Sequence, residues 1–316
     1  MANLGSLDIG TQGFGAMGLS NVYGQADDAE SIRTIHRATE LGIRLFDTAT
    51  GYGDGHNEQL LGRALGDRRD RVVIASKFTH RRGDSDEIIG ARQAVEASLQ
   101  RLNVDHIDLY YLHRVDPLVP IEDSVGELGR LQAEGKIGAV GVSEADAGQI
   151  RRAHAVTPLA ALQSEYSLWT REVEAEILPT VRALGIAFVA YSPLGRGFLA
   201  GGVPREQGDR RFIHPRFQKE AILANARRRR IIEDAAERLY VTPAQISLAW
   251  VLSKNVFPIP GTRHVSHLED NVAAGGIVLD AGTIAELDEA FPHGATAGDR
   301  YPPEQMKFVP RQPELA

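Results

Sequence analysis

The sequence predicts an α/β protein built as a (β/α)8 TIM barrel, with an extra helix after the seventh strand and a C-terminal tail. Three observations support this prediction. The chain has 316 residues, which is enough for a barrel of roughly 250 residues with additions. About eight short apolar runs recur along it, and amphipathic stretches of helical length separate them.

The expected strands are apolar throughout, which is typical of parallel strands covered on both faces. They are residues 13–17, 44–48, 72–77, 107–113, 137–143, 161–165, 187–192 and 256–260.

The intervening stretches have helical spacing and recognisable ends. Residues 28–41 and 88–102 place aliphatic side chains on one helical face. Thr242 followed by Pro243 is a typical helix start. Helices are expected to end at three glycines, Gly42, Gly135 and Gly185.

Two segments depart from the repeat. The polar segment 201–220 precedes the extra helix, and a tail rich in Gly and Pro begins near Gly294. Neither segment resembles a linker between domains, so residues 1–316 are predicted to form a single barrel domain.

Composition excludes several classes of protein. The chain is 43% hydrophobic and 24% charged, as expected of a soluble globular protein, and its net charge of −7 argues against nucleic acid or anionic membranes as partners. With no cysteine, it cannot use disulfides, thiolate catalysis or cysteine-ligated metals. The N-terminus has no signal-peptide pattern and no apolar run approaches the ~20 residues that cross a bilayer, so a cytoplasmic location is expected.

One motif suggests a different fold. Gly13, Gly15 and Gly18 fit the G-x-G-x-x-G fingerprint of doubly wound dinucleotide-binding proteins. The residues that follow do not open a helix, as that fingerprint requires. We therefore prefer the barrel, in which these glycines would allow close approach to a ligand at the barrel mouth.

Polar residues end three consecutive expected strands. Asp47, Lys77 and His113 stand at these ends, and Tyr52 lies just beyond Asp47. Taken one at a time, each has an ordinary structural explanation. Asp47 fits a helix cap, Lys77 fits an edge residue whose ammonium group reaches solvent, and His113 fits a hydrogen-bonded histidine of the core. Together they are predicted to meet at the carboxyl end of the barrel, where active sites of this fold lie.

This combination suits proton transfer to a carbonyl oxygen. A lysine ammonium beside Tyr52 would lower the pKa of the phenol, a carboxylate would hold the lysine, and a histidine could bind the substrate oxygen. None of these groups supplies a hydride, so a cofactor is required.

The chain resembles the aldo-keto reductases over essentially its whole length. It looks closest to a bacterial and plant branch with GxMG near the start and GDRYP near the end. The resemblance lies in FDTATGYGDGHNEQLLGRAL, IASKF, DLYYLHRVD, GKIGAVGVSE, LQSEYSL, YSPLGRGFLAGG and IPGTRHVSHLEDN, in that order.

The resemblance implies catalytic roles. Tyr52 would be the general acid in reduction, Lys77 and Asp47 would tune it, and His113 would orient the carbonyl. Because the steroid double-bond reductases of the family carry glutamate at the histidine position, His113 favours carbonyl over alkene reduction.

The expected cofactor is NADPH (NADP⁺). Tyr191 could stack on the nicotinamide, and Ser143 and Gln163 could bind its carboxamide. Thr262 and Arg263 stand at an expected helix start, a good place for a phosphate, and the resemblance implies that this is the 2′-phosphate of NADP. The other expected cofactor-binding residues are Met17, Ser192, Leu194, Gly195, Arg196, Gly261, His267, Asp270 and Asn271, of which those in SPLGRG would approach the pyrophosphate.

Two positions depart from the family pattern. Glu144 stands where asparagine is frequent, which leaves one carboxamide contact open. His267 stands where a second arginine is frequent, so affinity for the 2′-phosphate is expected to be weaker or more dependent on pH.

Two further polar features stand out in the second half of the chain. Arg227–Arg230 form a basic run that we interpret as a helix face paired with Glu233 and Asp234. His214 and Arg216, in the segment 201–220, are hypothesised to cover the cofactor.

Two other functions are compatible with a barrel of this kind. An NADPH-binding regulatory barrel, like the potassium-channel β subunits, would keep the same residues. A barrel hydrolase would need paired carboxylates or clustered metal ligands at the strand ends, and the sequence offers neither. No metal is expected, and the expected partner is a small carbonyl substrate, with small aromatic aldehydes as a first hypothesis. The walls of the substrate site are expected around Met17, Val22, Tyr23, Phe78, Trp169 and the segment 201–220. The oligomeric state stays open.

Overall fold

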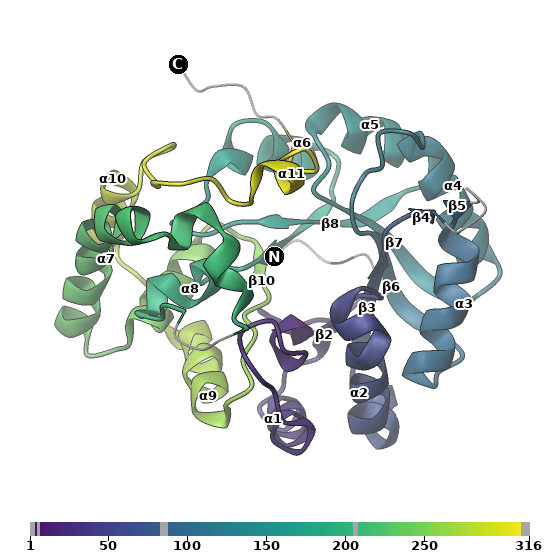
Figure 1. Ribbon diagram of the computed structural model, residues 1–316, viewed down its shortest axis with the longest axis horizontal. Coiled ribbons are helices and arrows are strands. Elements are labelled where there is room, and N and C mark those ends of the chain that lie inside the picture. Colours follow the sequence, from purple (N-terminus) through teal and green to yellow (C-terminus); the bar gives the residue numbers. More distant parts are fainter. Residues whose placement is uncertain (1–3, 5–6, 83–87, 205–207, 311–316) are drawn as a thin grey trace.

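Parallel strands form a curved sheet at the centre of the molecule, with helices around it (Figure 1). The structure is a computed structural model that describes residue 4 and residues 7–82, 88–204 and 208–310. The strand order is β1-β2-β3-β6-β7-β8-β9-β10. These strands are β1 (Phe14–Gly15), β2 (Leu45–Asp47), β3 (Val73–Phe78), β6 (Ile107–Leu112), β7 (Ile137–Ser143), β8 (Leu159–Glu165), β9 (Ala187–Tyr191) and β10 (Phe257–Pro258).

Hydrogen bonds join the two ends of this sheet. The N–H of Gly13 donates to the carbonyl oxygen of Pro258 at 3.0 Å, and the N–H of Gly15 donates to that of Pro260 at 3.2 Å. The barrel predicted from the sequence is therefore confirmed, with the β1 and β10 segments side by side.

Glycine is required where these two segments meet. A Cβ atom on Gly15 would lie 2.7 Å from the carbonyl oxygen of Ile259, and one on Gly261 would lie 2.1 Å from that of Gly15. At Gly15 the structure shows a close approach to the neighbouring strand segment, and the expected approach of these glycines to a ligand stays a prediction. A short 3-10 turn at Ala16–Leu19 follows β1, so the dinucleotide-binding helix start is absent from this part of the chain.

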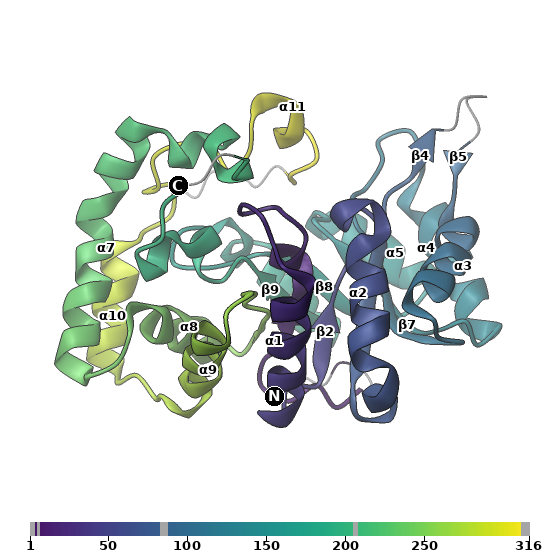
Figure 2. The same cartoon turned by 60° about the horizontal axis from the view of Figure 1, so that its bottom comes forward.

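The helices that surround the sheet follow the expected alternation (Figures 1 and 2). They are α1 (Asp28–Glu40), α2 (His56–Leu65), α3 (Ala91–Leu102), α4 (Ile121–Ala133), α5 (Ala147–Val156), α6 (Ile177–Ala183), α7 (Lys219–Leu239), α8 (Pro243–Ser253), α9 (Val265–Ala273), α10 (Ala281–Ala290) and α11 (Pro303–Met306).

The predicted helix ends agree with the structure. Gly42, Gly135 and Gly185 have φ values of 84°, 77° and 69°, the left-handed conformation that glycine adopts most easily. The hydroxyl of Thr242 accepts a hydrogen bond from the N–H of Gln245, and the Gln245 side chain accepts one from the N–H of Thr242. This capping box begins α8 as expected.

One boundary differs from the prediction. The helix expected over 88–102 begins at Ala91, because residues 88–89 form strand β5 (Ile88–Ile89) and pair antiparallel with β4 (Arg81–Arg82). The apolar run at 88–89 extended the helical pattern in the sequence. Short apolar runs fit both structures, and the strand partner lies in a different segment.

Side-chain alternation along the strands separates two cores and places the polar residues. Leu45, Val73, Ala75 and Leu109 pack inside the barrel, whereas their strand neighbours pack outward against the helices. Because the alternation has a period of two, the inward rows continue to Asp47 on β2 and Lys77 on β3. The strands themselves thus direct the polar groups to the carboxyl end of the barrel.

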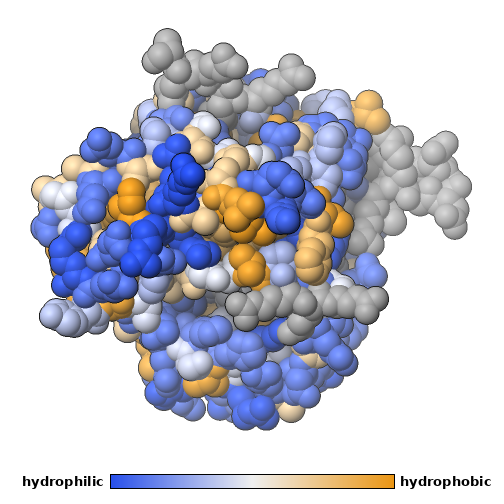
Figure 3. Space-filling model, turned by 60° about the vertical axis from the view of Figure 1, so that its left-hand side comes forward, coloured by the Kyte–Doolittle hydropathy of each residue, from blue (hydrophilic) through white to orange (hydrophobic). Residues whose placement is uncertain are grey.

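The extra helix α7 carries the basic run and lies on the side that comes forward in Figure 3. Arg229 pairs with Glu233 at 3.0 Å, and Arg230 pairs with Asp234 at 3.0 Å. The predicted pairing of this helix face is confirmed.

Candidate active site

Lys77 and Asp47 form a buried ion pair at the carboxyl ends of β3 and β2. The Nζ atom of Lys77 donates to the Asp47 carboxylate and to the carbonyl oxygen of Thr48, the latter at 2.6 Å. The second carboxylate oxygen of Asp47 accepts from the side-chain amide of Gln163 at 2.8 Å. Lys77 is fully buried and Asp47 nearly so, and these bonds fix the position of the ammonium group.

Tyr52 and His113 lie next to this pair. The Lys77 Nζ atom is 5.2 Å from the centre of the Tyr52 ring, and the His113 ring meets the Tyr52 ring edge-on with 5.9 Å between centres. The N–H of His113 donates to the carbonyl oxygen of Phe78 at 2.7 Å, which continues the pairing of β6 with β3. The structure therefore brings together the four residues predicted to be catalytic.

The pKa of Tyr52 differs from the expectation. Burial raises the pKa of the phenol above its ordinary value of 10, and Lys77 acts in the opposite direction without overcoming that increase. Burial lowers the pKa of His113 well below 6.5, and the charges of Arg114 and Lys77 lower it further. At neutral pH the site thus holds a neutral phenol and a neutral imidazole beside the Lys77–Asp47 ion pair.

The turn after Tyr52 has an unusual backbone. Gly53, Asp54 and Gly55 all have positive φ, and a Cβ on Gly55 would lie 2.6 Å from the Arg101 side chain. The chain thereby reverses within one short 3-10 segment and presents Tyr52 toward His113. Steric constraints therefore explain why glycine occupies these positions in the segment.

Two buried residues of α2 anchor this region, and sequence reasoning did not single them out. The Asn57 side chain accepts from the Thr48 hydroxyl at 2.7 Å and donates to the carbonyl oxygen of Ala16 at 2.9 Å. Glu58 is fully buried and accepts from the Ser76 hydroxyl at 2.5 Å. Asn57 and Glu58 directly follow the turn that carries Tyr52. Polar side chains that are buried need hydrogen-bond partners, so this adjacent pair could have indicated a hydrogen-bonded anchor for the turn.

The residues expected around the nicotinamide lie at neighbouring strand ends. Ser143 ends β7, Gln163 lies in β8, and Tyr191 ends β9 with its ring partly exposed. The amide N–H of Gln163 binds Asp47, so this residue also connects to the ion pair.

The segment after β9 has a backbone that few sequences adopt. Ser192 and Arg196, which are not glycines, have φ values of 49° and 55°, and Gly195 and Gly197 are also positive. A Cβ on Gly195 would lie 2.6 Å from the Trp169 ring. Such strained positions cost of order 1 kcal/mol each and gather at functional sites. Leu194 lies in the same segment.

Most of the remaining expected cofactor residues lie in α9 or directly before it. The Thr262 hydroxyl accepts from the N–H of His264 at 3.1 Å, and Arg263 donates to the carbonyl oxygen of Gln25 at 2.8 Å. No side chain caps the first turn of α9. His267, Asp270 and Asn271 follow in α9, Gly261 precedes it, and Met17 lies in the turn after β1.

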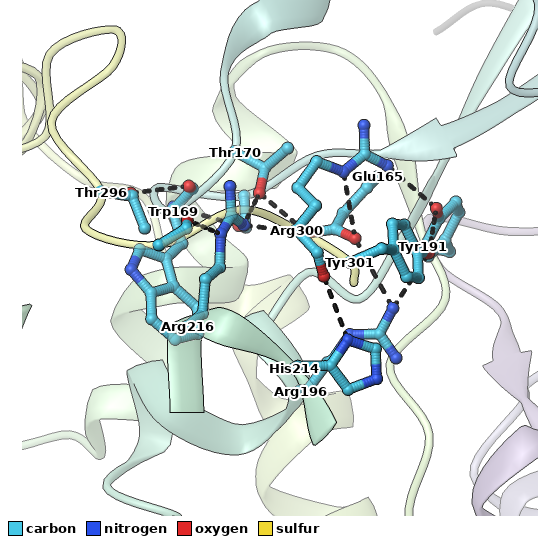
Figure 4. A network of polar contacts seen from close by, with 12 residues as sticks. Glu165, Trp169, Thr170, Tyr191, Arg196, His214, Arg216, Thr296, Arg300 and Tyr301 are labelled. Carbon is cyan, nitrogen blue, oxygen red and sulfur yellow. Dashed lines mark hydrogen bonds and ion pairs between the residues drawn. The ribbon is translucent and has the colours of Figure 1, made fainter. Parts of the chain in front are cut away.

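A buried network of arginines and carboxylates covers the β7–β9 side of the site (Figure 4). Arg300 donates to Glu144 at 2.8 Å and to the Tyr191 hydroxyl at 3.0 Å, and its Nε lies 3.5 Å from Glu165. Arg216 lies 3.3 Å from Glu165. These contacts attach the C-terminal segment to the ends of β7, β8 and β9.

Further members of this network come from segments that sequence reasoning left apart. The Tyr301 hydroxyl lies 2.9 Å from that of Tyr191 and accepts from Arg196 at 3.0 Å (Figure 4). His214 binds the carbonyl oxygen of Arg300 at 3.1 Å. The Arg196 side chain, expected near the pyrophosphate, is thus directed at the C-terminal segment. His214 and Arg216 join this network, and their hypothesised cover of a cofactor stays a prediction.

Glu144 has a different partner from the one the family pattern suggested. It stands at a frequent asparagine position, and here its carboxylate is buried and bound by Arg300 and by the N–H of Glu165. Burial opposes ionisation, but the charges of Arg300 and Arg114 keep the pKa of Glu144 below its ordinary value. Glu144, which departs from the family pattern, therefore forms an internal ion pair with Arg300.

Within the described ranges, no group of three or more His, Cys, Asp or Glu residues is arranged to hold a metal ion. Among the helices of those same ranges, none is long and apolar enough to cross a membrane.

Comparisons with known proteins agree with this geometry. The model of the aldo/keto reductase family matches residues 12–291. The chain belongs to the aldo/keto reductase family. It is 44% identical over 322 residues to the probable aldo-keto reductase 1 of Glycine max, covering 95% of this chain and 92% of that protein.

Solved structures give the same result. A glycerol dehydrogenase from Gluconobacter oxydans superposes with a TM-score of 0.79 at 29% identity, covering 98% of this chain and 96% of that one. An aldo-keto reductase from Klebsiella pneumoniae, in complex with NADPH, has a TM-score of 0.71 at 29% identity, covering 92% and 95%. The chain is an oxidoreductase of this family, as its motifs predicted.

Proposed function

We propose that the protein reduces aldehydes or ketones to alcohols with NADPH and that Tyr52 is the general acid. The meeting of Tyr52, Lys77 and His113 at the carboxyl end of the barrel carries this proposal. Family membership supports it, and relatives of this fold from Klebsiella pneumoniae were solved with NADP and with NADPH.

The residues present fit such a cofactor. Tyr191 is partly exposed at the end of β9, the Ser143 hydroxyl stands at the end of β7, and the first turn of α9 has N–H groups without a side-chain cap. Amide groups at a helix start bind phosphate well. Tyr191, Ser143 and Gln163 would hold the nicotinamide, and Thr262 and Arg263 would hold the 2′-phosphate.

The protein's own residues would handle the proton. NADPH supplies the hydride when it is bound. Tyr52 would donate its proton to the substrate oxygen as negative charge grows there, and Lys77 would stabilise the phenolate that remains. Neutral His113 can donate a hydrogen bond to the same oxygen. The raised pKa of Tyr52 keeps the phenol protonated, and therefore ready to donate, throughout the neutral range.

Consumption of NADPH in the presence of carbonyl compounds tests this function. We expect turnover of an activated aromatic aldehyde that depends on both aldehyde and enzyme, and less turnover with NADH. Tight NADPH binding without turnover of any aldehyde or ketone in a broad panel would contradict the proposal and favour a regulatory barrel.

The 2′-phosphate contact has its own test. Arg263→Ala should raise the KM for NADPH about tenfold and change the KM for NADH much less, because a charge-assisted contact is lost only with NADPH. His267→Arg should lower the KM for NADPH several-fold. Equal changes for both cofactors would place these residues outside the phosphate site.

The single-domain organisation and the cytoplasmic location stay predictions. Fractionation of cells that produce the protein would test the location.

A further inference from the structure

Arg114 follows His113 directly and lies among the residues of the site. Its Nη1 atom donates to the carbonyl oxygen of His113 at 2.7 Å and to the Ser143 hydroxyl at 3.2 Å. The guanidinium carbon is 6.0 Å from the centre of the Tyr191 ring. The residue as a whole is partly exposed, and these two hydrogen bonds hold its guanidinium beside His113 and Ser143.

Among the residues that the structure describes, Arg114 has no ion-pair partner within 4.0 Å, unlike the neighbouring cations. Lys77 binds Asp47, and Arg300 binds Glu144. Arg196 and Arg216 both lie within 4.0 Å of Glu165. In the part of the chain that the structure describes, no carboxylate lies within 4.0 Å of the Arg114 nitrogens, and neither Nε nor Nη2 has a hydrogen bond within the protein.

The free donors have the geometry of a carboxylate site. Nε and Nη2 of one guanidinium form the edge that binds both oxygens of a carboxylate in parallel. Burial disfavours the charged form of Arg114, but the phenols of Tyr191 and Tyr301 and the carboxylate of Glu144 more than offset it, so the guanidinium stays charged. A single free cation matches one carboxylate better than a phosphate dianion.

We propose that Arg114 binds a carboxylate on the substrate, so that the enzyme prefers carbonyl compounds that also carry a carboxylate. This inference rests on the proposed reductase function, because it assumes that the carbonyl is reduced beside Tyr52. His113 links the two positions: its ring meets Tyr52, and its backbone oxygen binds Arg114.

Matched substrates test the proposal. The 2-, 3- and 4-carboxybenzaldehydes would each be compared with the methyl ester of the same isomer, which keeps the aldehyde and loses the charge. The readout is the ratio of kcat/KM for the acid to kcat/KM for its ester, with NADPH saturating. In the wild type we expect this ratio to be well above one for at least one isomer.

Three variants locate the effect. Arg114→Met should lower the ratio about tenfold or more, mainly through the KM of the acid, because a charge-assisted bidentate contact is lost. Arg114→Lys should keep part of the preference. The control is Arg33→Met, which removes an exposed charge from α1, and it should leave the ratio within about twofold.

Several results would overturn the proposal. The ratio could be near one for every isomer in the wild type, or unchanged in Arg114→Met. Equal losses for acid and ester with a higher KM for NADPH would instead assign Arg114 to the cofactor.

Failure of this proposal is separable from failure of the reductase function. Turnover of the esters alone would uphold the reductase and reject the carboxylate site. If no aldehyde is reduced, calorimetric titration of benzoate and benzamide into the NADP⁺-saturated protein decides. Benzoate binding that Arg114→Met abolishes would support the site, and equal affinity for both ligands would reject it.

Discussion

At the scale of single residues, the Lys77–Asp47 pair is the clearest case of chemistry determined by position. Both side chains sit on the inward rows of their strands, one step beyond the apolar residues that fill the barrel. The period of a strand could therefore place them from the sequence alone. The pKa of Tyr52 could not be predicted in this way, because burial outweighs the lysine and depends on every neighbouring segment.

We predict that Lys77→Met destabilises the fold by about 3–5 kcal/mol, because it leaves the buried Asp47 carboxylate without its partner. The double variant Asp47→Asn with Lys77→Met should recover much of that loss, since no charge is left buried. Urea unfolding measures both values, and both variants should lack reductase activity. A Lys77→Met protein as stable as the wild type would contradict the assigned ion pair.

The network around Glu165 shows what single-residue reasoning misses. Glu144 and Arg300 are separated by 156 positions, and no local pattern connects them. In the sequence Glu144 is visible only as a departure from the family pattern. Its partner becomes evident once the C-terminal segment is placed over β7.

At the scale of elements, the strand and helix order was predictable because each unit repeats the same pattern of an apolar run, a polar turn and an amphipathic helix. The boundaries of the elements were less predictable. Strands β4 and β5 depend on pairing between two short segments, and the residues of β5 also fitted the helical pattern expected over 88–102. The contact between Gly15 and Gly261 that closes the barrel could not be predicted either, because a glycine in the sequence does not show which neighbour approaches it.

We predict that Gly261→Ala destabilises the protein by about 3 kcal/mol or more, or prevents folding, because its Cβ would lie 2.1 Å from the carbonyl oxygen of Gly15. Gly276→Ala is the matched control, since a Cβ there meets nothing within 4 Å and the φ angle is not positive. Thermal unfolding of the two variants measures the difference. Similar stability for both would mean that β1 and β10 are not in contact as described.

At the scale of the whole molecule, the buried network should make stability depend on pH. Burial opposes ionisation of Glu165, but Arg300, Arg196 and Arg216 lower the pKa of its carboxyl to about 2, against 4.5 in the unfolded chain. The folded-state pKa is depressed, so this stabilisation is complete above pH 4.5 and is lost as pH falls toward 2. The shift corresponds to about 3 kcal/mol.

We therefore predict that Glu165→Gln costs stability at pH 7 and that its deficit against the wild type shrinks as pH falls from 4.5 to 2. Unfolding by denaturant at a series of pH values measures this difference. A deficit independent of pH would show that Glu165 contributes packing alone.

His214 adds a second dependence at higher pH. Burial lowers the pKa of His214 to about 4, and Arg196 contributes to the decrease, so the imidazole is neutral in the fold. The unfolded chain takes up a proton near pH 6.5 and the folded protein does not, so stability should fall as pH falls from 6.5 to 4. His214→Gln should flatten this part of the profile, and His113, whose pKa burial also lowers, should contribute to the slope that remains. An unchanged slope would contradict the neutral, buried imidazole.

These profiles also test the predicted organisation of the chain. If residues 1–316 form one domain, each unfolding curve should be a single cooperative transition by both fluorescence and circular dichroism. Two separated transitions would indicate that the α7 and C-terminal segments unfold independently of the barrel.

The most direct test of the central claim is the turnover of Tyr52→Phe with NADPH and an activated aldehyde, measured together with NADPH affinity by fluorescence titration. We predict that kcat falls by about 10²–10⁴, the usual contribution of a general acid, while NADPH binding changes little. Turnover within a few-fold of the wild type would contradict the assignment of Tyr52 as the proton donor.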